Sequence, residues 1–269
     1  MSMSTDSTVV GVVGLGYVGL PLCLSMVEAG YTVVGVDIDQ ERIETLRRGE
    51  SYVTEIEDDR VADAVDRGFR PTTDYSELGS ATGISVCVPT PLRKTGTPDM
   101  SYVSAAVDDI ATVVSPDTTV IIESTVYPGA TQEIVQPAFE KEGFQVGEDL
   151  FLAFSPERID PGNEEYPPEK IPKVLGGVTN SCGDHAEALY SSVFETVVRV
   201  DSAIEAELVK LLENTFRAVN IGLINEIAQI ADELDVDIWS AIDAASTKPF
   251  GFMPFYPGPG LGGHCIPVD

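Results

Sequence analysis

The sequence predicts an α/β fold in which a doubly wound, parallel sheet is followed by one long helix and a further helical segment. Three observations predict this fold. A strand, a glycine-rich turn and a helix are expected in succession between residues 8 and 29. Apolar segments of strand length then alternate with helical segments as far as residue 154. Residues 202–234 keep a helical pattern that no proline interrupts. Alternating strands and helices are typical of parallel sheets that are covered on both faces.

The first turn has the spacing Gly-x-Gly-x-x-Gly and directly follows an apolar strand. Gly14 permits a tight turn, and Gly16 lets a pyrophosphate group approach the backbone. Gly19 lets the helix expected at residues 17–29 pack against the strand, so that the positive end of this helix points at the phosphates. The combination of strand, glycines and helix predicts a Rossmann domain that binds a dinucleotide.

The second strand, expected at residues 31–37, ends on an acidic residue. Asp37 lies about 20 residues beyond the glycines, where a carboxylate binds the ribose hydroxyls. It therefore favours NAD over NADP as the cofactor. Arg42, one turn into the next helix, leaves three roles open: it could stack on adenine, be solvated, or accept a 2′-phosphate.

The alternation continues through the rest of this domain, which we expect to span residues 1–200. Helices are expected at residues 41–48, 60–66 and 102–113, and strands at residues 83–88, 119–124 and 150–154, the last strand of the sheet. Polar turns follow these strands and contain Thr90, Thr125 and the charged pair Glu157 and Arg158. Ligands of such sheets bind at the carboxyl ends of strands. Thr90 and Thr125 are therefore predicted to face the nicotinamide half of the cofactor, with strand capping as the alternative.

The second region, residues 201–269, begins with the long helix. Ser202 and Glu205 have the spacing of a capping box at its start. A helix of about 33 residues would be about 50 Å long, more than one small domain covers, so we expect it to pack against its copy in a homodimer. Lys210 and Asn214 share one face of this helix, and Arg217 lies near that face. These side chains are either site residues or part of a solvated face with the neighbouring acids.

A glycine-rich loop at residues 257–264 is followed directly by Cys265, and Asp269 comes one helical turn later. Glycines let a backbone approach a bulky substrate, and a thiol at the end of such a loop can form a covalent adduct with a carbonyl carbon. The alternative is a small buried residue beside a turn. The four cysteines are far apart and the chain has only two histidines, so no disulfide framework and no metal site are predicted.

The composition is strongly acidic. With 44 acidic and 16 basic residues the formal charge is -28, so the chain would repel nucleic acids and anionic membranes. Because 43% of the residues are hydrophobic, the acidity is expected on a solvated surface, which predicts a halophilic source and self-repulsion at low salt. No signal peptide and no apolar run of about 20 residues is found, so a cytoplasmic location is expected.

Six segments carry a more specific signal: Gly14-Leu-Gly-Tyr-Val-Gly-Leu-Pro21, Val86-Cys-Val-Pro-Thr-Pro91, Glu123-Ser-Thr-Val-Tyr-Pro-Gly129, Ser155-Pro-Glu-Arg158, Glu207-Leu-Val-Lys-Leu-Leu-Glu-Asn214 and Gly262-Gly-His-Cys265. Together they resemble the nucleotide-sugar 6-dehydrogenases, the family of UDP-glucose and UDP-N-acetylhexosamine dehydrogenases, over nearly the whole chain. Within that family, residues 248–258 and the Gly-Gly-His-Cys form resemble the UDP-N-acetylglucosamine branch. The resemblance implies a place in polysaccharide biosynthesis.

The resemblance also implies a four-electron oxidation of C6 of a UDP-sugar, with two NAD molecules as acceptors. Cys265 would hold the aldehyde as a thiohemiacetal, and hydrolysis of the later thioester would release the uronic acid. Lys210 and Asn214 would stabilise the oxyanion at C6, an effect worth roughly 3 kcal/mol per donor. The base for the hydrolytic water would be Glu157, aided by Thr125 and Asp269.

Binding residues follow from the same resemblance. Contacts with NAD would come from Tyr17, Val18, Asp37, Arg42, Thr90 and Thr125, and contacts with the UDP-sugar from Arg158, Ile159, Lys210, Asn214, Arg217 and Gly262. Members of the family continue past the cysteine motif into a second doubly wound domain that holds the UDP moiety, whereas this sequence ends at Asp269. We therefore expect the chain to bind NAD but to hold the sugar weakly.

Three alternatives stay open. The substrate could be UDP-glucose. The chain could be a two-electron hydroxyacid dehydrogenase of the 6-phosphogluconate type, which also has a Rossmann domain, a long helix and a Lys-x-x-x-Asn pair but needs no nucleophilic thiol. It could also be a non-catalytic module that binds NAD or dimerises.

Overall fold

The structure is a computed structural model that describes residues 8–94, 96–158 and 170–258. The chain divides into two compact units, Met1–Leu208 and Val209–Asp269. The first unit contains the sheet, and the second contains most of the long helix. Each unit is described by itself below.

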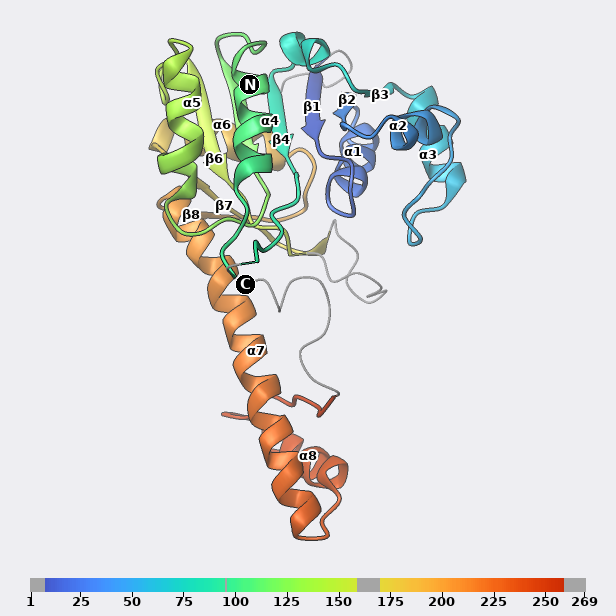
Figure 1. The fold of residues 1–269 in the computed structure, drawn as a ribbon, viewed down its shortest axis with the longest axis vertical. Helices are drawn as coiled ribbons and strands as arrows, with labels where there is room; N and C mark the ends of the chain where they lie inside the picture. Colours follow the sequence, from blue (N-terminus) through green and yellow to red (C-terminus); the bar gives the residue numbers. More distant parts are fainter. Residues whose placement is uncertain (1–7, 95, 159–169, 259–269) are drawn as a thin grey trace. The chain divides into compact units, whose positions relative to one another are not determined.

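The first unit is built on an eight-stranded sheet with the order β3-β2-β1-β4-β5-β6-β7-β8 (Figure 1). Its strands are β1 (Val9–Val13), β2 (Thr32–Val36), β3 (Phe69–Thr72), β4 (Gly83–Val86), β5 (Thr118–Ile122), β6 (Leu150–Phe154), β7 (Lys173–Gly177) and β8 (Val197–Val200). All neighbouring pairs are parallel except β6 and β7, which are antiparallel. The predicted α/β fold with a doubly wound sheet is confirmed, with this one reversal.

The prediction that residues 150–154 form the last strand is wrong, because β7 and β8 follow β6 in the same sheet. Strand β3 was not predicted either. Each of the three missed strands is short, and each has a residue that weakens the strand pattern: a proline in β3, two glycines in β7 and an arginine in β8. Pro71 is tolerated because β3 is at the edge of the sheet, where a missing backbone donor costs little.

Four helices of this unit lie near their predicted positions: α1 (Gly19–Glu28), α2 (Gln40–Arg47), α3 (Asp58–Asp66) and α4 (Ser101–Ala111). The sequence did not predict α5 (Gln136–Lys141), α6 (Asn180–Tyr190), the 3-10 helix η2 (Tyr75–Ser80) or the π-helical turn η3 (Thr131–Val135). Helix α1 starts at Gly19 instead of residue 17, because residues 14–18 form the turn that links it to β1.

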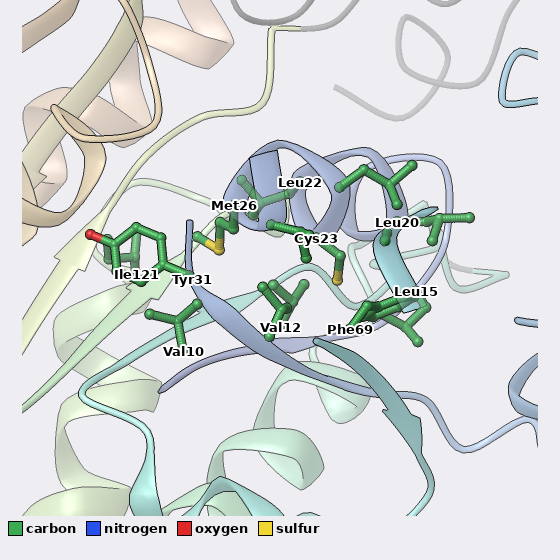
Figure 2. Packing of buried hydrophobic residues seen from close by; sticks show 14 of the residues in the cluster. Val10, Val12, Leu15, Leu20, Leu22, Cys23, Met26, Tyr31, Phe69 and Ile121 are labelled. Atoms are coloured by element: carbon green, nitrogen blue, oxygen red, sulfur yellow. The ribbon is translucent and has the colours of Figure 1, made fainter. Parts of the chain in front are cut away.

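The main core cluster lies between the sheet and the helices α1 and α6. Alternate strand residues contribute to it, such as Val10 and Val12 of β1, as expected when successive side chains point to opposite faces. Figure 2 shows Cys23 and Met26 of α1 above these two valines. Cys23 is fully buried.

The long helix α7 (Ala203–Glu233) has 31 residues and begins where the sequence predicts. The Ser202 hydroxyl accepts a hydrogen bond from the Glu205 backbone nitrogen at 3.2 Å. The Glu205 carboxylate in turn accepts one from the backbone nitrogen of Asp201 at 2.9 Å. This is the predicted capping box, with the reciprocal bond moved one residue earlier in the chain.

A second carboxylate fixes the start of α7 to the sheet. Glu207 is fully buried and accepts hydrogen bonds from the backbone nitrogens of Gly129 at 2.5 Å and Thr131 at 2.9 Å. It also accepts a bond from the Thr131 hydroxyl at 2.6 Å. The loop that follows β5 is thereby held to the first turns of α7.

In the second unit, α7 is followed by α8 (Ile238–Ser246) and an irregular segment. The Asp237 carboxylate caps α8 by accepting a hydrogen bond from the Trp239 nitrogen. The irregular segment packs on α7, because the Phe255 ring lies 5.8 Å from that of Phe216 and the Gly258 nitrogen donates to Asn225 at 3.0 Å. Among the described helices, none is both long and apolar enough to cross a membrane.

We expect Glu207→Gln to lower the free energy of unfolding by about 2 kcal/mol, because an amide NH₂ would face backbone donors that a carboxylate now satisfies. Urea denaturation followed by circular dichroism measures the change. Glu226→Gln is the matched control, since its side chain is exposed on the same helix. Equal losses for the two variants would contradict the role given to the buried carboxylate.

Candidate functional site

The glycine turn after β1 has the close contacts that its spacing predicts. Gly14 has a φ of 91°, and a Cβ at this position would lie 2.7 Å from the carbonyl oxygen of Cys87. A Cβ at Gly19 would lie 1.8 Å from the Gly14 oxygen, so a larger residue cannot occupy this position without moving the turn. Gly16 has open space around it instead. This space is what a phosphate group needs to approach the backbone.

A pocket of about 290 Å³ adjoins the turn, close to the lower end of the usual range for ligand pockets. It is formed by the glycine turn, the start of α2 and the loop that follows α2. Its lining residues are Gly16, Tyr17, Asp39, Glu41, Arg42, Thr45, Tyr52 and Val53. Tyr17 is 63% exposed and Val18 is half-buried, so both are accessible from this end of the sheet.

Asp37 follows β2 directly and joins two turns. One carboxylate oxygen accepts a hydrogen bond from the Leu15 nitrogen at 2.8 Å, and the other accepts one from the Asp39 nitrogen at 3.0 Å. The residue is buried. The predicted ribose-binding carboxylate therefore also holds the glycine turn against the start of α2.

Arg42 is held by acidic and aromatic neighbours. Its guanidinium lies 3.5 Å from the carboxylates of both Asp37 and Asp39 and 5.3 Å from the centre of the Tyr52 ring. A planar cation on an aromatic face is a favourable arrangement. The side chain is 44% exposed, so these contacts are compatible with each of the roles left open by the sequence.

Tyr52 is a pocket residue that sequence reasoning did not identify. Its hydroxyl donates a hydrogen bond to the Leu15 carbonyl oxygen, and burial, helped by the charge of Asp37, raises the pKa of the phenol. The ring thus stays neutral while it forms one wall of the pocket. Its position, in a loop some ten residues after Arg42, gave no periodic signal.

The polar turns after β4 and β5 lie next to each other, because these strands are parallel neighbours. Thr90 comes four residues after β4 and Thr125 three residues after β5, and both are half-buried. The structure therefore brings the two threonines to the same edge of the sheet as the glycine turn.

A buried cluster of charges, which we call the Glu–Lys cluster, lies at this edge and consists of Glu123, Glu157 and Lys173. The Lys173 ammonium lies 2.7 Å from the Glu123 carboxylate and 2.9 Å from that of Glu157. The side chains of Lys173 and Glu123 are 6% and 0% exposed, whereas that of Glu157 is 14% exposed. Glu157 is thus the outermost member.

Two hydroxyl groups extend the cluster into the core. Tyr190 of α6 donates a hydrogen bond to Glu123, and its oxygen lies 2.9 Å from the Ser85 hydroxyl. Burial raises the pKa of Glu123 to about 6, although Lys173 acts against this rise. Burial also raises the pKa of Tyr190 well above its usual value, with a further contribution from Glu123.

Sequence reasoning missed Lys173, Tyr190 and the role of Glu123. Glu157, by contrast, was predicted as a site residue, and its second carboxylate oxygen accepts a hydrogen bond from the Arg158 nitrogen at 2.6 Å. The Arg158 guanidinium donates to the Pro172 oxygen at 2.7 Å. A lysine in a predominantly acidic chain was the available signal, but its partners come from segments distant in sequence.

In the second unit, the spacing of Lys210, Asn214 and Arg217 places them along one side of α7. With about 3.6 residues per turn, that side is opposite to the side that carries Leu212 and Leu223. The predicted site residues Ile159, Gly262, Cys265 and Asp269 lie outside the described residues. Within the part of the chain that the structure describes, no three histidine, cysteine or carboxylate residues are grouped as a metal site.

Comparison with known proteins gives two family matches that together cover most of the chain. Residues 8–194 match the NAD binding domain of the UDP-glucose/GDP-mannose dehydrogenase family. Residues 204–269 match the central domain of the same family.

Individual relatives agree with these matches. The chain is 41% identical to a UDP-N-acetyl-D-glucosamine 6-dehydrogenase from Pseudomonas aeruginosa over 97% of this chain and 61% of the relative. It is 38% identical to a UDP-N-acetyl-D-mannosamine dehydrogenase from Pyrococcus horikoshii, over 97% of this chain and 62% of the relative. A solved structure of a UDP-D-ManNAc dehydrogenase from Pyrococcus horikoshii superposes with a TM-score of 0.90 at 36% identity, covering 96% of this chain and 62% of the other. The chain thus spans about 60% of the length of the relatives it matches.

We expect Asp37→Asn to weaken NAD binding by about 10- to 100-fold, the usual effect of losing hydrogen bonds to a charged group, and to reduce the preference for NAD over NADP. The reason is that the carboxylate repels a 2′-phosphate and accepts from hydroxyl groups. Calorimetric titration with each cofactor measures both effects. Glu44→Gln, at an exposed position on α2, is the control, and an NAD affinity equal to that of this control would contradict the prediction.

Proposed function

Because the chain belongs to the UDP-glucose/GDP-mannose dehydrogenase family, we propose that it forms the NAD-binding and catalytic part of an enzyme that oxidises C6 of a UDP-N-acetylhexosamine to a carboxylate. The observation that carries the proposal is the common edge of the sheet. The dinucleotide pocket and the outermost acid of the Glu–Lys cluster both lie at the carboxyl ends of its strands. Ligands of such sheets bind at that edge.

The residues at the pocket fit NAD. The open space at Gly16 and the positive N-terminal end of α1 suit a pyrophosphate. The buried carboxylate of Asp37 suits the ribose hydroxyls, and Arg42 and Tyr52 offer planar surfaces for adenine. Bound NAD would supply the hydride acceptor for each oxidation step.

The first oxidation converts the C6 alcohol to an aldehyde, with loss of a hydride and a proton. In our proposal, Cys265 then adds to the aldehyde carbon through its sulfur, and Lys210 and Asn214 stabilise the oxygen that becomes negative. A preorganised donor of this kind is worth roughly 3 kcal/mol. The second oxidation removes a hydride from the thiohemiacetal and leaves a thioester.

Hydrolysis completes the reaction. Glu157 would take a proton from water, with Thr125 and Asp269 assisting, and the water oxygen would replace the Cys265 sulfur at the carbonyl carbon. The position of Glu157 supports this role, because it is the member of the Glu–Lys cluster that reaches the surface. The net result is one uronic acid for two reduced cofactors.

We infer the class of the substrate from the relatives. Both relatives quoted above are named for a UDP-N-acetylhexosamine, and the predicted resemblance to the UDP-N-acetylglucosamine branch agrees with that class. UDP-glucose is the second candidate, because the family description includes it. We place the sugar contacts on Arg158, Ile159, Lys210, Asn214, Arg217 and Gly262.

We also propose two regions and a homodimer. The NAD-binding domain would span residues 1–200 and the central helical region residues 201–269, a boundary supported by the gap between the two family matches.

The dimer contact would be an apolar stripe on α7, consisting of Leu212, Phe216, Val219, Leu223, Ile227 and Ile230, all of them exposed. Their spacing of three and four residues places them on one side of the helix. In an isologous dimer, this stripe would pack against the same stripe of a second copy of the chain.

The first test is the yield of NADH per sugar, measured with UDP-N-acetylglucosamine, UDP-N-acetylmannosamine and UDP-glucose in molar potassium chloride. We expect two NADH for each sugar consumed. Cys265→Ser should abolish oxidation to the acid, whereas Cys182→Ser on α6 should not. One NADH per sugar would indicate a two-electron dehydrogenase. NAD binding without any NADH formation would indicate a binding module.

The second test concerns assembly. We expect Leu223→Asp to convert the dimer to a monomer, because a charge at the centre of an apolar contact would be buried without a partner. Sedimentation velocity measures the molecular mass. Gln229→Asp adds the same charge at an exposed position well away from the stripe and should leave the dimer intact. A monomeric unmodified chain would overturn the dimer proposal.

A further inference from the structure

The reversal of β7 has a consequence for the site. Because β6 and β7 are antiparallel, the first residue of β7 lies at the carboxyl end of β6, at the edge where ligands bind. The pairs Ala153 with Gly177 and Phe154 with Gly176, continued in register, place Lys173 opposite Glu157. A parallel β7 would start at the opposite edge of the sheet.

The contacts of Lys173 fix Glu157 on both sides. One Glu157 oxygen accepts a hydrogen bond from the Lys173 ammonium at 2.9 Å, and the other accepts a hydrogen bond from the Arg158 backbone nitrogen at 2.6 Å. Lys173 is itself held by Glu123 at 2.7 Å, and the Phe194 ring lies 5.3 Å from its nitrogen. The carboxylate therefore has little freedom to rotate.

A small cavity borders Glu157 and Lys173. Its volume is about 20 Å³, enough for about one water molecule, and its wall also includes Ser25, Arg158 and apolar side chains such as Val18 and Phe194. The side chains of Glu123 and Lys173 are more completely buried than that of Glu157. Water can thus approach the outer carboxylate while the lysine stays in a low-dielectric environment.

The titratable groups around Lys173 come from four segments of the chain. Glu123 follows β5 and Glu157 follows β6, while Tyr190 of α6 and Cys87 after β4 are kept neutral because burial raises their pKa values. Burial acts to lower the pKa of Lys173, but the two carboxylates together outweigh burial and raise it. The cluster therefore holds one stable cation between two acids that repel each other.

We propose that Lys173 is a positioning residue, which holds Glu157 in place and in its ionised form for proton abstraction from water, while Glu123 fixes Lys173 from the inner side. This inference rests on the base role of Glu157 in the proposed function. Lys173 does not touch substrate in this arrangement; it acts through Glu157.

Replacement of Lys173 and replacement of Glu123 should shift the protonation of Glu157 in opposite directions. In Lys173→Met, two acids would share a buried site without a cation, so the pair would keep a proton to higher pH. In Glu123→Gln, the whole charge of Lys173 would act on Glu157, which would lose its proton at lower pH. A lysine that only stabilised the fold would produce neither shift.

The first measurement does not need turnover. Glutamate labelled with ¹³C at the carboxyl carbon is titrated by NMR in the whole chain, and Glu157→Gln and Glu123→Gln identify the two signals. We expect the Glu157 signal to titrate at least one pH unit higher in Lys173→Met and lower in Glu123→Gln. Lys173→Arg should resemble the unmodified chain. Lys141→Met, an exposed lysine on α5, is the control, and an identical titration in Lys173→Met and this control would overturn the proposal.

The second measurement follows the reaction. In Lys173→Met we expect two NADH to form rapidly per chain and turnover to fall by about 10- to 100-fold, a typical loss for a residue that orients another. Mass spectrometry should then find the acyl group on Cys265, with kcat/KM for the sugar unchanged because only the hydrolysis step is slowed. Normal turnover without the adduct would overturn the proposal.

Two safeguards separate the possible failures. If Lys173→Met does not fold by circular dichroism, the double variant Lys173→Met with Glu123→Gln removes both inner charges and leaves Glu157 for the same titration. If the unmodified chain forms no NADH from any UDP-sugar, the proposed function fails. The carboxyl titration still decides whether Lys173 controls Glu157, because its readout needs no substrate.

Discussion

The ion pairs of Lys173 with Glu123 and Glu157 are the interaction on which this end of the sheet depends. They join segments that follow β5 and β6 to the first residue of β7, and Tyr190 attaches α6 to the same group. A buried charge without a partner is strongly unfavourable, so each member requires the others in place. The antiparallel direction of β7 is therefore tied to the chemistry of the site, since it is what brings a lysine to the carboxyl ends of β5 and β6.

The nucleotide end of the same edge is organised by a single carboxylate. Asp37 accepts hydrogen bonds from the turns after β1 and β2, and it also pairs loosely with Arg42. The glycine turn, by contrast, is shaped by steric contact, because a side chain at Gly19 would meet the Gly14 oxygen. The glycine turn is thus shaped by the steric exclusion of side chains, whereas the contacts of Asp37 depend on its charge. Both solutions leave backbone or polar groups directed at the space where ligands bind.

Sequence reasoning succeeded where structure is specified locally. The glycine spacing and the cap of α7 depend on residues within a few positions of one another, and Asp37 directly follows the apolar strand that it ends; the structure shows the corresponding turn, capping box and strand end. It failed for the Glu–Lys cluster and for Glu207. Those contacts join residues 16 to 78 positions apart, and they depend on the strand order and on the reversal at β7. Charged residues are visible in a sequence, but their pairing across a sheet is not.

The distribution of charge connects the fold to its proposed ligands. The formal charge of the chain is -28, and the proposed ligands, a dinucleotide and a nucleotide sugar, are themselves anionic. Long-range attraction cannot help such binding, so positive potential must come from groups placed at the site. The start of α1, Arg42 and Lys173 lie at the edge of the sheet, and both cations are already paired with acids of the chain. Salt would weaken the general repulsion between protein and ligand while leaving short, partly buried contacts nearly unchanged, because screening acts mainly on exposed charges. We therefore expect high ionic strength to favour both the fold and the binding of the proposed ligands.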